Sequence, residues 1–101
     1  MDVSVRHTTL ETNVYEIVIA ITVTGTQSGK TAFLVEVEEA GIFEVRGVPA
    51  EQLPHALNVY CPTILFPYAR QVIDSAMNQG SLPSMLLPPF NFEALAQGPR
   101  N

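Results

Sequence analysis

The first half of the chain alternates apolar and polar residues with the period of two that is typical of β-strands. The alternation starts with Val3 and Val5 and is interrupted at 10–13. It resumes in residues 14–24, where one face carries five large side chains: Tyr15, Ile17, Ile19, Ile21 and Val23. The opposite face of that segment mixes apolar and polar residues, which predicts a strand with one buried face and one partly exposed face.

Short breaks divide this half of the chain into strands. Residues 25–29, GTQSG, have the composition of a turn. A strand is predicted over 31–40, with Phe33 and its alternate neighbours on one face and Leu34 and its alternate neighbours on the other. Ala40 and Gly41 predict a second break, and a last short strand follows before Pro49 ends it. Connections this short favour antiparallel pairing.

The period changes to that of a helix after Glu51. Pro62 suits the first helical turn and Gly80 suits the C-terminal cap, so the pattern predicts a helix over 62–79. Pro67 falls inside it and predicts a kink or a delayed start. The apolar positions recur at helical spacing: Leu65, Phe66, Ala69, Val72, Ile73, Ala76 and Met77.

The C-terminal part begins with the proline-rich apolar loop SLPSMLLPPF at 81–90. Asn91 is then expected to cap a short helix with the sequence FEALAQ. Strands come first and helices last, which predicts an α+β fold in which residues 1–101 form one domain.

Composition narrows the range of functions. The chain has 101 residues, a net charge of −5, 47% hydrophobic and 15% charged residues. An acidic balance disfavours nucleic acid and anionic membranes and favours a basic partner or simple solubility. The apolar runs fall short of the ~20 residues that span a bilayer, and one cysteine suits a reducing compartment, so we expect a cytoplasmic protein without membrane insertion.

Candidate chemistry is sparse. Cys61 could pair with His55 or His7, with Asp74 as the orienting group, but no catalytic motif surrounds it and a proline follows it. We therefore interpret it as a buried small hydrophobe. One cysteine and two scattered histidines do not have zinc-ligand spacing. The segment GTQSGK at 25–30 suits a hairpin turn better than a phosphate loop. We expect no enzyme, metal or cofactor.

Surplus apolar side chains stand out near the C-terminus. They are Leu82, Met85, Leu86, Leu87, Phe90 and Phe92. These side chains could simply seal the sheet, or the loop and the sheet could frame a groove for an extended apolar peptide.

Three segments, TAFLVEVEEAGIF, EQLPHALNVYCPTILFPYAR and LLPPFNFEAL, resemble the SecB family of export chaperones in one register over about 13–96. The resemblance implies a four-stranded antiparallel sheet, or three-stranded here, followed by a long helix and a short one. It also implies a homotetramer, built as a dimer of dimers, that holds unfolded precursor proteins and passes them to the motor SecA without using nucleotide or metal.

The resemblance and the residue types together give three sets of candidate residues. The client-binding groove is expected at Ile42, Phe43, Tyr60, Leu86, Leu87, Phe90 and Phe92. The SecA-docking surface is expected at Leu34, Glu36 and Glu38. The oligomer interface is expected on the long helix at Phe66, Ala69, Val72, Ile73 and Ala76.

SecB chains have a further strand ahead of the segment that matches 1–9, and this sequence does not contain it, so we expect altered strand pairing or assembly. Two other functions stay open. One is an adaptor dedicated to a single client, such as the antitoxin of a toxin–antitoxin pair. The other is an oligomerisation module without a client.

Overall fold

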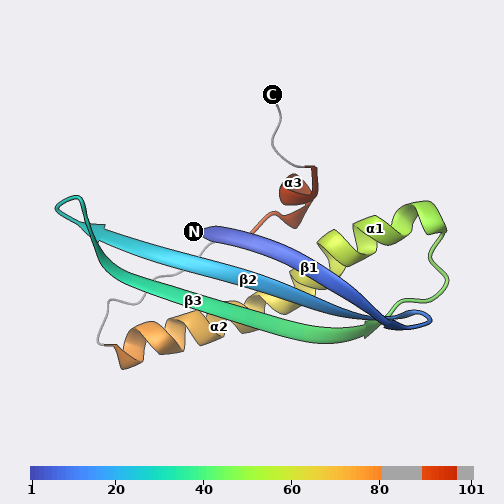
Figure 1. The fold of residues 1–101 in the computed structure, drawn as a ribbon, viewed down its shortest axis with the longest axis horizontal. Coiled ribbons are helices and arrows are strands. Elements are labelled where there is room, and N and C mark those ends of the chain that lie inside the picture. The colour runs from blue at the N-terminus through green and yellow to red at the C-terminus, as the bar shows by residue number, and fades with distance from the viewer. Residues whose placement is uncertain (81–89, 98–101) are drawn as a thin grey trace.

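The computed structural model describes residues 1–80 and 90–97. Its first part is an antiparallel sheet in the order β1-β2-β3 (Figure 1). The strands are β1 (Asp2–Glu11), β2 (Val14–Gln27) and β3 (Lys30–Glu44). A long helical stretch and a short C-terminal helix follow, which confirms the α+β fold with a three-stranded sheet.

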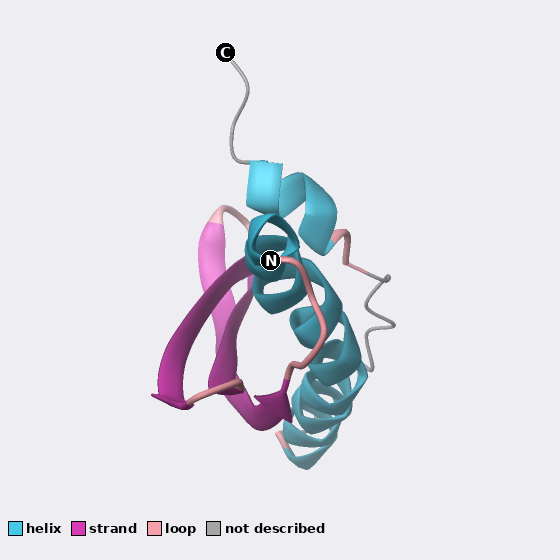
Figure 2. Ribbon diagram, turned by 90° about the vertical axis from the view of Figure 1, so that its right-hand side faces the viewer, coloured by secondary structure: helices cyan, strands magenta, loops and turns pink. Residues whose placement is uncertain are grey.

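The molecule has two layers, with the helices on one side of the sheet (Figure 2). The predicted inner face of β2 is the centre of the core, since Ile17 and Ile19 are fully buried and Ile21 is 1% exposed. Phe66, Ile73 and their neighbours on the helix meet them from the other layer. The opposite side of the sheet is called the outer face below.

The turn between β2 and β3 is tighter than the sequence predicts. The strand runs through Gly25 to Gln27, and only Ser28 and Gly29 connect it to β3. Both residues have positive φ, 54° and 77°, as tight hairpin turns require. Gly25 stays in the strand because the ring of its cross-strand partner Phe33 lies where a Cβ atom would be.

The predicted break at Ala40 and Gly41 is wrong, because β3 continues through both residues to Glu44. Gly41 does not form a turn. It allows the sheet and the helix layer to approach each other closely. A Cβ atom at Gly41 would lie 2.8 Å from Cδ2 of Leu65 on the long helix. The glycine thus lets the helix approach β3, which a larger residue would obstruct.

The helical stretch starts earlier than predicted. A 3₁₀ turn, η1 (Ala50–Gln52), leads into α1 (Leu53–His55), the π-helical turn η2 (Ala56–Tyr60) and α2 (Cys61–Gln79). Pro62 lies in the first turn of α2, as expected, and α2 runs on through Pro67.

The short helix α3 (Phe92–Gln97) confirms the prediction of a capped C-terminal helix. The Asn91 side-chain Oδ1 accepts a hydrogen bond of 3.2 Å from the backbone N–H of Ala94. Within residues 1–80 and 90–97, no helix is long and apolar enough to cross a bilayer.

Candidate functional site

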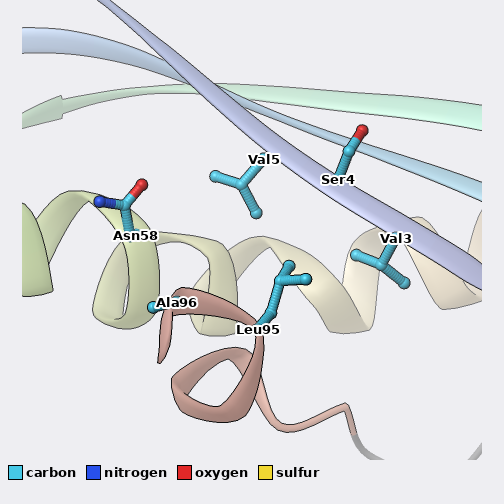
Figure 3. Close-up of a pocket in the computed structure, with 6 residues that line it drawn as sticks. All are labelled: Val3, Ser4, Val5, Asn58, Leu95 and Ala96. Carbon is cyan, nitrogen blue, oxygen red and sulfur yellow. The ribbon is translucent and has the colours of Figure 1, made fainter. Parts of the chain in front are cut away.

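A pocket of about 350 Å³ lies between the edge strand β1, the turn η2 and the helix α3 (Figure 3). Val3 and Val5 point into it from β1, and Leu95 points toward them from α3. The lining is mainly apolar, with Asn58 as a polar group beside Val5: Val3, Ser4, Val5, Asn58, Leu95 and Ala96.

Within the described part of the chain, the strand beside this pocket, β1, pairs with β2 on one side and leaves its other edge unpaired. An unpaired edge presents backbone N–H and C=O groups that an additional strand can bind. Asn58 is held at the pocket by its own turn, since its Nδ2 donates to the carbonyl oxygen of Pro54 at 2.8 Å. Open backbone and apolar pocket therefore lie side by side.

Three aromatic rings join α3 to α2. The Phe92 centroid lies 5.8 Å from that of Phe66 and 4.9 Å from that of Phe90, in edge-to-face arrangements. Phe92 is 2% exposed, so it belongs to the core. A contact of 3.1 Å between His55 Nε2 and Glu93 Oε1 adds a polar link between α1 and α3. The position of α3, and with it one wall of the pocket, thus rests on apolar packing and one polar contact.

The outer face of the sheet is acidic at β3. Glu36 and Glu38 flank a hollow of about 430 Å³ over β2 and β3. Leu34, on the same face, is 55% exposed. Arg6 on β1 reaches Glu38 with both guanidinium nitrogens, Nη1 to Oε1 at 3.3 Å and Nη2 to Oε2 at 3.2 Å. This carboxylate raises the pKa of Arg6 through the hydrogen bond first and charge attraction second.

The side of α2 that faces away from the sheet carries an apolar stripe. Ile64, Tyr68 and Val72 are 56%, 60% and 46% exposed and lie at successive intervals of four residues. Side chains at this spacing share one face of a helix. The stripe is therefore a continuous apolar surface without a cover in the described chain.

The comparisons with known proteins agree on one family. Residues 1–100 match the family model for "Preprotein translocase subunit SecB". The chain is also 50% identical over 95 residues to the "Protein-export protein SecB" of Legionella pneumophila strains Corby, Lens and Paris, an overlap of 94% of this chain and 59% of each relative. The chain belongs to the SecB family. It spans about three fifths of the length of these curated relatives.

The SecB-type groove predicted from the sequence is only partly assembled in the described residues. Phe90 and Phe92 meet in the aromatic cluster, and Leu86 and Leu87 lie outside the described residues. Phe43 packs at the margin of the core on the inner side.

Two other groove candidates lie apart from that cluster. Ile42 is the neighbour of Phe43 on β3 and points to the outer face, where it is 68% exposed, so these two side chains do not line one groove. Tyr60 borders a separate pocket of about 360 Å³, where its ring lies edge-on to His55 at 4.7 Å. The groove assignment stays a prediction.

Sequence reasoning missed the pocket at the edge of β1. Val3, Val5 and Leu95 were visible as apolar residues, but nothing in the sequence indicates that α3 folds back beside the first strand. Asn58 was missed because no local sequence pattern indicates the π-helical turn that presents it.

The five helix residues predicted to form a SecB-type interface fall into two groups. Phe66, Ala69 and Ile73 are buried against the sheet within one chain, whereas Val72 and Ala76 are exposed. Ile64 and Tyr68 lie on the exposed face and were not predicted. Their spacing from Val72 was the available signal.

Cys61 lies at the start of α2 and is 5% exposed. Burial raises the pKa of its thiol, which disfavours the thiolate needed for nucleophilic attack. His55, its proposed partner, contacts Glu93 and Tyr60 instead. Within the described ranges, no group of three or more His, Cys, Asp or Glu side chains is placed to hold a metal ion.

Proposed function

We propose that the protein is an export chaperone of the holdase type, which binds unfolded precursor proteins in the cytoplasm and delivers them to SecA. The observation that carries the proposal is the apolar pocket beside β1, a strand that pairs on one side only within the described residues, in a chain of the SecB family. This combination offers an unfolded chain both backbone hydrogen bonds and a place for apolar side chains.

A client segment binds in an extended conformation along β1. Its backbone pairs with the strand edge, and alternate side chains enter the pocket between Val3, Val5 and Leu95. Specificity is low, because backbone pairing does not depend on sequence and the pocket selects only for apolar character. Phe90, half-buried in the aromatic cluster, offers a client a further apolar contact.

Affinity per site is modest. Full burial of one large apolar side chain contributes about 1.5–3 kcal/mol. Ordering a flexible client opposes this with about 2–5 kcal/mol or more. Several sites acting on one client overcome the deficit, which is the physical reason for an oligomeric holdase.

Copies of the chain assemble through the stripe of Ile64, Tyr68 and Val72, because these side chains are apolar and stay exposed among the described residues. Ala76 continues the exposed side of α2 by one turn and gives a partner helix close access. The SecB resemblance implies a long helix inside a homotetramer, and the exposed stripe on α2 supports that role for it.

SecA docks on the outer face, at Leu34, Glu36 and Glu38. Two carboxylates beside one exposed leucine suit a basic partner that also buries a small apolar contact. The docking surface lies on the outer face at β3, and the client pocket lies on the helix side at β1. One molecule can therefore engage both partners.

The test replaces Val5 and Leu95 together by serine and titrates the variant with an unfolded precursor. We expect a loss of affinity of about tenfold or more, because the pocket loses its two facing apolar side chains. Thr8→Ser on the same strand is the control, since Thr8 does not line the pocket. Molecular mass by light scattering should be the same in all variants.

Undiminished affinity in the double variant would place the client site elsewhere. The breadth of clients separates the remaining functions. A holdase prevents aggregation of several unrelated unfolded proteins, a dedicated adaptor acts on one, and an oligomerisation module acts on none.

A further inference from the structure

Arg6 and Glu38 belong to strands that are not neighbours. Arg6 lies on β1 and Glu38 on β3, and in the strand register β2 passes between them with Val18 and Ala20. Two strand spacings amount to about 10 Å, so the arginine side chain must extend across the outer face to make its paired hydrogen bonds. Val18 points to this face and is only 7% exposed, consistent with a side chain crossing above it.

This ion pair changes the docking surface described above. Glu38 already forms a bidentate ion pair with Arg6. Glu36, two residues earlier on the same face, has no hydrogen-bond or ion-pair partner among residues 1–80 and 90–97. Of the two carboxylates beside the hollow, one is therefore open and the other is occupied.

We propose that Arg6 competes with the basic partner of the outer face for Glu38. This competitor role lowers the affinity of the face for that partner. A lysine or arginine of the partner binds Glu36 directly but must displace Arg6 to reach Glu38. Both Arg6 and Glu38 are about 60% exposed, with side-chain values of 60% and 61%, so the displacement is easy and the competition weak. Arg6 is thus a positioning residue, which acts on docking through Glu38. The inference rests on the docking proposed above for SecA.

The experiment measures SecA affinity for six proteins at low salt: the unchanged chain, Arg6→Gln, Glu38→Gln, the double variant of the two, Glu36→Gln and Arg46→Gln. Freeing Glu38 by Arg6→Gln should tighten binding about two- to fivefold, the size of an exposed ion pair. The gain should be clearly smaller when Arg6→Gln is made in the Glu38→Gln background, because the carboxylate is then missing.

Arg46→Gln is the matched control. Arg46 also pairs with a glutamate of β3, Glu44, but this pair lies at the C-terminal end of the strand, whereas Glu36 and Glu38 lie near its middle. Eight residues of strand separate Glu44 from Glu36, about 27 Å, which is well beyond the screening length of ~10 Å at 0.1 M salt. Arg46→Gln should therefore leave SecA affinity unchanged. Equal gains in affinity from Arg6→Gln and Arg46→Gln would mean that only net charge matters.

The outcomes separate the two proposals. Weaker binding by Glu36→Gln without any gain from Arg6→Gln overturns the competitor role and keeps the docking surface. No change in either variant overturns both. An equal gain from Arg6→Gln with and without the Glu38 carboxylate shows a general field effect and also overturns the competitor role. Urea unfolding of each variant verifies that the fold is intact.

Discussion

The two faces of the sheet come from the same strands and differ in almost every physical respect. On the inner face, Ile17, Ile19 and Ile21 are sealed by the helices. On the outer face, glutamates, an arginine and the exposed Leu34 meet the solvent. One residue of shift along a strand moves a side chain from one environment to the other. Alternate positions of one segment thus serve the core on the inner face and the proposed docking on the outer face.

Substitutions of exposed residues on the outer face should therefore change the free energy of unfolding only slightly. Exposed charge pairs contribute about 0–1 kcal/mol to the free energy of unfolding, whereas a buried aliphatic side chain contributes several times more. Val18 marks the boundary, since it points outward and is still largely covered.

The largest effect is expected at the centre of the inner face. Ile19→Ala should lower the free energy of unfolding by about 2–5 kcal/mol, because it leaves a cavity beneath the helices. Thr24→Ala, on the outer face of the same strand, should change it by less than about 0.5 kcal/mol. Urea unfolding at fixed protein concentration gives both values. Similar losses in the two variants would contradict the division of the sheet.

A medium effect is expected where α2 approaches β3. Gly41→Ala places a methyl group 2.8 Å from Cδ2 of Leu65, so the side chain or the helix must shift. Overpacking of this kind costs about 1–3 kcal/mol. Ala40→Ser is the control, because Ala40 is exposed on the outer face next to it. If thermal unfolding shows Gly41→Ala to be as stable as the unchanged chain, the approach is looser than the structure indicates.

The smallest effect on stability is expected at Glu36. Glu36→Lys should change the free energy of unfolding by about 0.5 kcal/mol or less, since the side chain is exposed and unpaired in the described chain. The same substitution should weaken SecA binding and leave precursor binding intact. A pair of titrations, one with each partner, measures this. Equal loss in both would show that Glu36 supports the fold.

The inner face was predictable from the sequence because burial leaves a strict alternation of large apolar residues, as in 14–24. The cap at Asn91 was predictable for a similar reason, since the local chain determines it. Gly25 and Gly41 were misinterpreted as turn residues. Each is required by a neighbour distant in sequence, the ring of Phe33 and the side chain of Leu65.

The candidate site was less predictable than the fold. The pocket needs α3 to fold back beside β1, and the ion pair needs Arg6 to reach across β2 to Glu38. Both depend on contacts between residues more than thirty positions apart, for which the sequence contains no local pattern. The acidic outer face was predicted from the alternation in β3, but its internal arginine was not.

The two-residue turn of Ser28 and Gly29 also bears on how fast the protein reaches its fold. It joins strands of 14 and 15 residues, so pairing can begin at the turn and extend outward without a long loop to close. Isolated hairpins form in about 1–10 μs, so the pairing of β2 with β3 can be an early event. A hairpin that has paired but is not yet covered by α2 exposes the apolar row of β2. Until the helix covers that row, the newly made chain resembles the unfolded proteins it is proposed to hold.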